Sequence, residues 1–170
     1  IGDVPVIASA GRAYPVETRY LGKPPADHFR DNLCPAVASA VKQALRDETG
    51  SILTFLPGEG EIRRVQNLLN DSSLPGDVDL LPLYGALPQN QQDEAISPPL
   101  AGRRKVVLAT AIAETSLTIE GIRVVIDGGQ SRGPRFDPQS GMTRLFTEPV
   151  SLAGAKQRRG RAGRLEPGIC

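Results

Sequence analysis

The strongest constraint on the fold comes from short, largely apolar runs with the length of β-strands. Four such runs occupy residues 51–56, 78–83, 105–110 and 123–127. Apolar residues fill these runs without a regular alternation with polar ones, so we expect both sides of each strand to be buried. Strands of this kind are typical of a parallel sheet that is covered on both faces.

Segments with helical spacing separate these runs. Apolar residues recur every three or four positions in residues 61–70 and 88–96, and also from Pro35 to Gly50, where Pro35 suits the first helical position. Residues 14–21 alternate and predict one more strand. Strands alternating with helices predict an α/β fold with a mostly parallel central sheet and helices on both faces.

One segment departs from this alternation. Residues 135–146 are two short runs around an Asp-Pro-Gln-Ser-Gly turn, which predicts a β-hairpin inserted over residues 134–149. Taken alone, such a hairpin is more often decoration than a functional device. We expect residues 1–170 to form a single domain cut from a longer chain, with a leading strand and linker in residues 1–25.

The octet at residues 157–164, QRRGRAGR, holds four arginines and two glycines. Ser151 is a suitable N-cap, and a helix continuing through the octet would place Gln157, Arg161 and Arg164 on one face. Guanidinium groups at this spacing suit the oxygens of a polyphosphate, and the glycines would let a phosphate or another backbone approach. Two other interpretations are equally open: a basic surface helix, or an RGR-type element that touches nucleic-acid phosphates.

Several neighbouring residues favour structural roles. We expect Arg158 to form a salt bridge within the domain and Arg159 to be a solvated charge. Asp127 with the two glycines after it predicts a strand-end turn, and Thr118 predicts a strand end or helix cap.

Composition excludes several classes of function. With 20 basic and 19 acidic residues the net charge is +1, so any surface that binds nucleic acid must be local. His28 is the only histidine, which excludes histidine-based zinc sites and Ser-His-Asp catalysis. Two lone cysteines, Cys34 and Cys170, predict a reducing and therefore cytoplasmic location. No apolar run reaches the length of a membrane span.

The sequence lacks the phosphate loop and the metal ligands that complete a phosphoryl-transfer site. None of its glycines fits the pattern Gly-x-x-x-x-Gly-Lys-[Ser/Thr] of a phosphate loop. Residues 57–61, PGEGE, open a helix after a strand, but their two glutamates would repel a phosphate. No paired acidic motif follows a strand to hold magnesium, so we predict no metal ligand in this chain and place the loop and the metal ligands on another domain.

Four motifs resemble those of DEAH-box helicases in helicase superfamily two. Residues 109–119, ATAIAETSLTI, look like the family's ATNIAETSLTI motif, and the octet resembles its sixth motif, QRxGRxGR. Residues 55–58 are similar to the fourth motif and residues 83–88 to the segment after it. Order and spacing agree over essentially the whole chain. Residues 134–137 and 165–168 look most like the bacterial HrpB subfamily.

The resemblance implies the second RecA-like domain of an ATP-dependent RNA helicase. The first RecA-like domain would then be its partner, and it would carry the phosphate loop and hold most of the Mg²⁺ that accompanies ATP. This chain alone is therefore expected not to hydrolyse ATP. Single-stranded RNA or another nucleic acid is the second implied partner, and a membrane is not.

The resemblance also assigns roles to individual residues. The implied catalytic residues, which reach the γ-phosphate of ATP and its attacking water, are Gln157, Arg161 and Arg164. Ser116 and Glu120 would lie near that water and the ribose. The implied contacts to the RNA backbone are made by Gly85, Thr110 and Ala111. Most relatives have Asn where this chain has Ala111. Arg135, Phe136 and Arg144 belong to a hairpin near the point where strands part.

A different class of function is also compatible with these motifs. A non-catalytic nucleic-acid-binding or adaptor module could keep the helicase-like fold and use the same arginines to bind the RNA backbone directly. It would show a salt-dependent RNA affinity that is lost when Arg161 and Arg164 are replaced by alanine.

Overall fold

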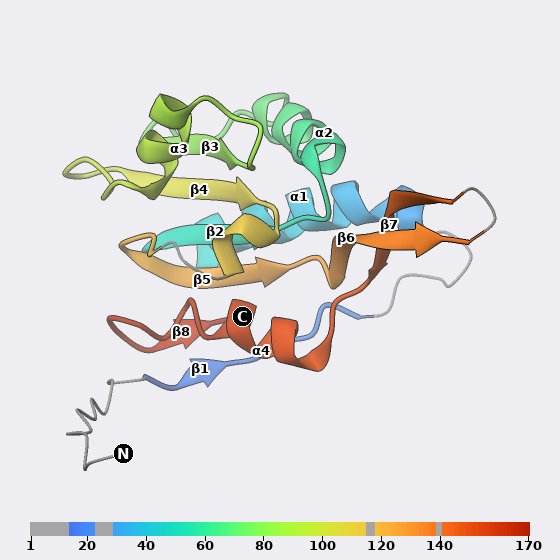
Figure 1. The fold of residues 1–170 in the computed structure, drawn as a ribbon. Coiled ribbons are helices and arrows are strands. Elements are labelled where there is room, and N and C mark those ends of the chain that lie inside the picture. The colour runs from blue at the N-terminus through green and yellow to red at the C-terminus, as the bar shows by residue number, and fades with distance from the viewer. Residues whose placement is uncertain (1–13, 23–28, 115–117, 139–140) are drawn as a thin grey trace, which may run out of the picture.

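The computed structural model describes residues 14–22, 29–114, 118–138 and 141–170. Its central sheet has six strands in the order β1-β8-β5-β2-β4-β3, and every pairing between them is parallel (Figure 1). The strands are β1 (Val16–Glu17), β2 (Ser51–Phe55), β3 (Val78–Leu83), β4 (Arg104–Ala109), β5 (Ile122–Asp127) and β8 (Gly168–Ile169). The predicted α/β class with a parallel sheet is confirmed.

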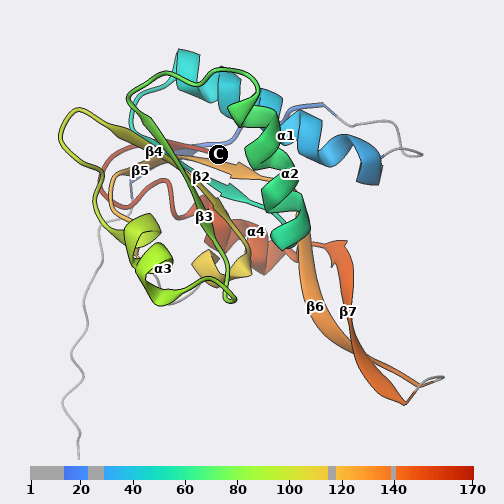
Figure 2. The same cartoon turned by 90° about the horizontal axis from the view of Figure 1, so that it is seen from above.

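Helices cover both faces of the sheet, as the alternation of strands and helices predicted (Figure 2). Helices α1 (Phe29–Asp47) and α2 (Glu59–Asn70) pack on one face. The other face is covered by α3 (Gln89–Ile96), by the short 3₁₀ helix η2 (Ala111–Glu114), and by Ala162 in the turn that follows α4 (Leu152–Arg159).

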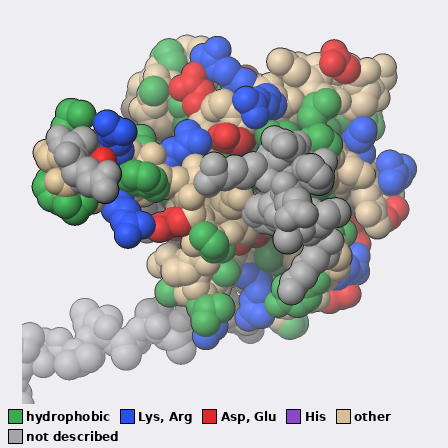
Figure 3. Space-filling view, turned by 90° about the vertical axis from the view of Figure 1, so that its right-hand side faces the viewer, with side chains coloured by type: hydrophobic (Ala, Val, Ile, Leu, Met, Phe, Trp, Pro, Cys, Tyr) green, Lys and Arg blue, Asp and Glu red, His purple; other side chains and the backbone are tan. Residues whose placement is uncertain are grey.

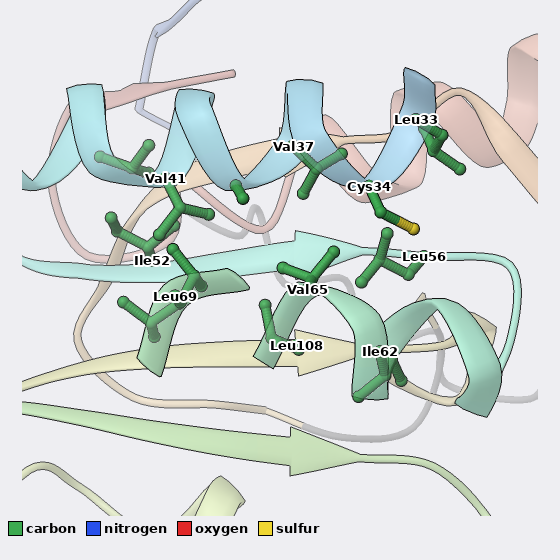
Figure 4. Close-up of a cluster of buried hydrophobic side chains, with 13 residues drawn as sticks. Leu33, Cys34, Val37, Val41, Ile52, Leu56, Ile62, Val65, Leu69 and Leu108 are labelled. Atoms are coloured by element: carbon green, nitrogen blue, oxygen red, sulfur yellow. The ribbon is translucent and has the colours of Figure 1, made fainter. Parts of the chain in front are cut away.

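Strand β2 lies at the centre of the core, and all five of its residues are buried. Ile52 points toward α1 and α2, where it packs with Val41 and Leu69 in the cluster of Figure 4. Leu53 and Phe55 belong to the cluster on the opposite face. Alternation along one strand therefore supplies both halves of the core.

Two predicted boundaries were wrong near the N-terminus. Helix α1 begins at Phe29, so Pro35 lies inside it rather than at its first position. The helix extends upstream of the proline because Leu33 and Cys34 are buried, at 8% and 6% exposure. Strand β1 covers only two residues of the predicted run, because its partner β8 is equally short.

Strand β8 was not predicted from the sequence. It lies between β1 and β5 in the sheet, and Ile169 pairs with Val124 of β5. Two residues cannot display a period, so this strand carries no recognisable pattern of its own.

The predicted hairpin is present, and it is longer than expected. Strands β6 (Gln130–Asp137) and β7 (Met142–Pro149) pair antiparallel along eight residue pairs, so the hairpin starts four residues before the predicted insertion. It projects away from the body of the domain (Figure 2).

Adjacent leucines on α2 give a matched test of the core. Leu69 is fully buried, whereas Leu68 is 39% exposed. We expect Leu69→Ala to lower the free energy of unfolding by about 2–5 kcal/mol, because it removes buried methyl groups and leaves a cavity. Leu68→Ala should change it by about 0.5 kcal/mol or less. Urea unfolding of both variants measures the difference, and equal losses would contradict this packing.

Candidate functional site

A pocket of about 250 Å³ lies between the segment that enters β5 and the turn that follows α4. It brings together Glu120, Arg161 and Arg164, three residues that the sequence assigned to one nucleotide site. The remaining lining residues are Thr118, Ile119, Gly121, Ile122 and Leu165. Two segments about forty residues apart in the sequence thus converge on this pocket.

Arg161 is held firmly in the wall of this pocket. Its side chain is 6% exposed, and Nη2 donates a hydrogen bond to the main-chain oxygen of Glu114, the last residue of η2. Burial lowers the pKa of Arg161, and the neighbouring positive charge of Arg164 lowers it further, whereas Glu114 raises it. Because a guanidinium remains protonated in proteins, the result is a partly desolvated cation.

Arg164 is exposed and points across the same pocket. Its Nη1 donates to the hydroxyl of Thr118 at 2.7 Å. The sequence favoured a capping or strand-end role for Thr118, whereas the structure makes this residue an acceptor for Arg164. The contact joins residues 46 positions apart, which no local pattern could reveal.

The helical arrangement predicted for the octet is wrong. Helix α4 ends at Arg159, and Gly160 is its C-cap, so Arg161 and Arg164 lie in the turn beyond the helix. Ser151 does cap the helix, since its hydroxyl accepts from the amide of Gly154 at 3.1 Å. Gln157 lies exposed on α4 and does not line the pocket. Ser116 falls outside the described residues.

The octet's two glycines have different surroundings. A Cβ added at Gly163 would lie 2.6 Å from the main-chain oxygen of Tyr14, and the Tyr14 amide donates to the Gly163 oxygen at 2.9 Å. At Gly160 the nearest atom to an added Cβ would be the Lys156 oxygen, at 3.4 Å. Of the two options open in the sequence, close approach of another backbone is therefore what the structure shows at Gly163.

The expected roles of the octet's other two arginines are confirmed. Arg158 is 1% exposed and forms salt bridges with Glu114 at 2.6 Å and with Asp127 at 2.7 Å. Arg159 is exposed to solvent. The turn after β5 is also confirmed, because the Gly129 amide donates to Asp127 Oδ1 at 2.9 Å.

The residues expected to contact RNA lie at the carboxyl ends of β3 and β4. These two strands are neighbours, with Leu83 opposite Ala109, and the Thr110 amide donates to the Leu83 oxygen at 3.1 Å. Gly85 is exposed, and Thr110 and Ala111 are half-buried. The structure therefore places all three residues along one edge of the sheet.

The hairpin has an unusual pairing near its tip. Arg135 lies directly opposite Arg144, where like charges repel each other. Phe146 and Met142 belong to the neighbouring pairs on the same face, and both are exposed. Phe136 lies on the opposite face of the ribbon and is 61% exposed. Figure 3 shows hydrophobic and basic side chains side by side on the projecting lobe at its left.

The base of the hairpin is fixed to the body of the domain by Arg132. Its Nε donates to the Thr147 hydroxyl of β7 at 3.1 Å, and its Nη2 lies 3.6 Å from Glu61 Oε1 of α2. A Cβ at Gly58, the N-cap of α2, would lie 2.5 Å from Arg132 Nη1. The guanidinium of Arg132 therefore covers the N-terminus of α2.

The donor set of the pocket suits an anion with several oxygens. Two guanidinium groups and the Thr118 hydroxyl fit phosphate groups, and among the described lining residues Glu120 is the single carboxylate. In the described part of the chain, no three acidic, cysteine or histidine residues gather as they would around a metal ion. Within the same residues, no helix is both long and apolar enough to cross a membrane.

The parallel sheet, its projecting hairpin and the motifs at its edge define a RecA-like helicase domain. The sequence model described as "Helicase conserved C-terminal domain" matches residues 36–166, and the chain belongs to that family. The resemblance to DEAH-box helicases is thereby confirmed, and the most similar relatives include a member of the HrpB subfamily that the sequence indicated.

Similarity to known proteins extends over nearly all of the chain. It is 59% identical over 167 residues to the ATP-dependent RNA helicase HrpB of Escherichia coli K12, covering 98% of this chain and 20% of that protein. It is 43% identical over 171 residues to the pre-mRNA-splicing factor ATP-dependent RNA helicase prp22 of Schizosaccharomyces pombe, covering 98% of this chain and 14% of that protein.

A solved structure of the Escherichia coli DEAH/RHA helicase HrpB has the same fold, with a TM-score of 0.85 and 59% identity. The match covers 97% of this chain and 20% of that one. The chain thus spans a fifth or less of the length of these relatives.

The two glycines of the octet can be tested against each other. Gly163→Ala should lower the free energy of unfolding by about 1–3 kcal/mol, because its Cβ would overlap the Tyr14 backbone. Gly160→Ala should be tolerated within about 1 kcal/mol, since Gly160 has helical φ and ψ angles of −62° and −11°. Thermal unfolding of both variants measures the difference. Equal tolerance would show that Gly163 is not packed against Tyr14.

Proposed function

We propose that this domain is the second motor domain of an ATP-dependent RNA helicase and supplies Arg161 and Arg164 to ATP bound against a first RecA-like domain. The observation that carries this proposal is the convergence of both arginines with Glu120 on a single pocket. The pocket opens on the surface of this domain, so a ligand there could also contact another domain.

Both arginines would act on charge that develops during phosphoryl transfer. The planar fork of a guanidinium can bind two oxygens of the γ-phosphate at once. Because Arg161 is partly desolvated, its attraction for an anion is stronger than that of a solvated arginine. Glu120 would face the ribose, and we keep Gln157 and Ser116 as further proposed contacts to the γ-phosphate and its attacking water.

Mg²⁺ would neutralise phosphate charge in the closed site, and we place its ligands mainly on the first RecA-like domain. This division agrees with the donor set of the pocket, since Glu120 is the only carboxylate among its described lining residues. The isolated chain would then lack both the phosphate loop and the metal ligands, and it would not hydrolyse ATP.

Single-stranded RNA would lie along the edge of the sheet formed by Gly85, Thr110 and Ala111. The exposed Gly85 and the half-buried pair at the end of β4 offer backbone groups and one hydroxyl to phosphates. Ala111 contributes no polar side chain, so base selectivity from this edge should be low.

The hairpin would act where the strands of a duplex separate. Arg135 and Arg144 are paired directly across the ribbon, so a phosphate between them would relieve the repulsion of their like charges. The exposed Phe136 and Phe146 offer surfaces on which bases could stack. The hairpin thus combines phosphate binding with base stacking, the two kinds of contact that suit unpaired strands.

We place the protein in the cytoplasm. Cys34 and Cys170 are free thiols, and burial raises the pKa of Cys170 to about 11. Both would remain reduced and uncharged in such a compartment.

The arginine roles can be tested in the full-length protein. Arg161→Ala and Arg164→Ala should each lower kcat for ATP by about 10³ or more, with a much smaller rise in KM, because they stabilise transition-state charge. Lysine at either position should restore little of the rate, since an ammonium lacks the planar fork. Steady-state ATPase assays with RNA measure both parameters.

Arg159→Ala is the matched control, because Arg159 lies in the same basic run but is exposed on α4. An equal loss of kcat in this variant would mean that the local positive charge, and not the position of each guanidinium, is responsible. Loss of salt-dependent RNA affinity with normal ATPase in the Arg161 variant would instead favour the non-catalytic binding module.

The hairpin calls for a separate test in the same protein. Replacing Arg135 and Arg144 together by alanine should reduce unwinding of a duplex while sparing RNA-stimulated ATPase. The slope of log affinity against log salt should fall by about 0.7 per lost phosphate contact. Leu145→Ala, on the opposite face of the ribbon and 67% exposed, serves as control. Equal loss of unwinding and ATPase would contradict the proposed role.

A further inference from the structure

Among the described residues, Arg158 is the largest side chain that is fully buried, with 1% of its surface exposed. Its Nε donates to Glu114 Oε1 at 2.7 Å, and its Nη1 donates both to Asp127 Oδ1 at 2.7 Å and to the Gln130 main-chain oxygen at 3.0 Å. Its Cζ lies 5.0 Å from the centroid of the Phe55 ring. A single guanidinium therefore joins η2, β5 and β6 beside the central strand β2.

One end of this network reaches the arginine pocket through Glu114. The Glu114 carboxylate accepts from Arg158, while its main-chain oxygen accepts from Arg161. Glu114 ends η2 and precedes the segment that supplies Thr118 to the pocket lining. Any movement of Arg161 toward a ligand must therefore either stretch its bond to Glu114 or carry Glu114 along.

The other end of the network reaches the first residue of the hairpin. Gln130 begins β6, and its main-chain oxygen accepts from Arg158. Asp127 accepts from Arg158 and also from the Gly129 amide, at 2.9 Å. The turn from Asp127 to Gln130 is thus bound to Arg158 at two points, immediately before the hairpin leaves the sheet.

A guanidinium is suited to this junction because its donors are rigid and point in several directions. Its planar fork can bond two carboxylates and a carbonyl oxygen at the same time, and its flat face can lie on Phe55. A lysine would keep the positive charge between Glu114 and Asp127. It could not maintain all three bonds in the same geometry.

We propose that Arg158 is a positioning residue that couples Arg161 in the nucleotide pocket to the base of the hairpin. In this role Arg158 transmits a shift of Glu114 and Arg161 on nucleotide binding to Gln130, and so to the hairpin strands. The inference rests on the proposed helicase function, because it assigns the link between ATP turnover and strand separation to one side chain.

The test uses the full-length protein with Arg158→Lys and Glu114→Gln, and with Arg159→Lys as the matched exposed control. Glu114→Gln keeps the main-chain oxygen that binds Arg161 and removes only the charge that binds Arg158. We expect the number of base pairs unwound per ATP hydrolysed to fall about five-fold or more in both network variants. Their KM for ATP should change little, and Arg159→Lys should behave as the unaltered protein does.

Loss of overall stability would produce a different pattern. It would lower ATPase and unwinding in proportion to the folded fraction, which thermal unfolding reports, and would leave the ratio of unwinding to ATPase unchanged. That result in the two network variants would overturn the inference. If Arg161→Ala also retained a normal kcat, the proposed function would fail as well as the coupling through Arg158.

A second measurement requires no altered network residue. Amide hydrogen exchange of the unaltered full-length protein, with and without ADP and aluminium fluoride as a transition-state mimic, should show changed protection at residues 130–133. Exchange there that does not respond to the mimic would overturn the coupling, even if both network variants failed to fold.

Discussion

Burial of β2 on both faces and along both edges is the constraint on which the rest of the structure depends. Its five residues are buried, and β4 and β5 pair with it on either side. Because all these pairings are parallel, the carboxyl ends of neighbouring strands meet at one edge of the sheet. The loops that leave this edge carry Gly58, Gly85, Thr110 and the Asp127 turn. Residues from distant motifs therefore become neighbours as a consequence of strand direction, which is why binding residues of α/β proteins gather there.

A buried positive charge sets the second constraint. Burying the Arg158 guanidinium without anions nearby would be strongly destabilising, and Glu114 and Asp127 supply two compensating carboxylates. Once Glu114 is fixed by that ion pair, its main-chain oxygen offers a rigid acceptor to Arg161. The pocket thus owes part of its geometry to a residue that does not line it. Removing either carboxylate would leave a charge incompletely compensated, which generally costs more than the pair contributes.

The sequence predicted the long elements well because their signal is local. Strands β2 to β5 lie within one residue of their predicted bounds, since runs of buried apolar residues mark both ends. The errors arose where distant contacts decide. Nothing near Gly160 shows that α4 ends there, although glycine weakens a helix by about 1 kcal/mol relative to alanine. Pro35 suggested a helix start, yet burial of Leu33 extends the helix upstream of it.

The candidate site shows the same division. The motifs grouped Glu120 with Arg161 and Arg164, and all three line one pocket. The part played by Thr118 in that pocket became visible only in the structure, through its hydrogen bond to Arg164.

The shortest strands have an effect on the site that their size does not suggest. The turn carrying Arg161 and Arg164 is held from behind by the edge of the sheet, where Tyr14 bonds Gly163 and the Gly168 amide donates to the Pro15 oxygen at 3.1 Å. The Ala162 oxygen lies so close to Gly168 that a side chain there would not fit. Residues 14–17 precede the main body of the domain and belong to the predicted leading strand, to which the sequence assigned no part in the site. Because they pack against the arginine turn, they also form part of the scaffold that positions the two guanidinium groups.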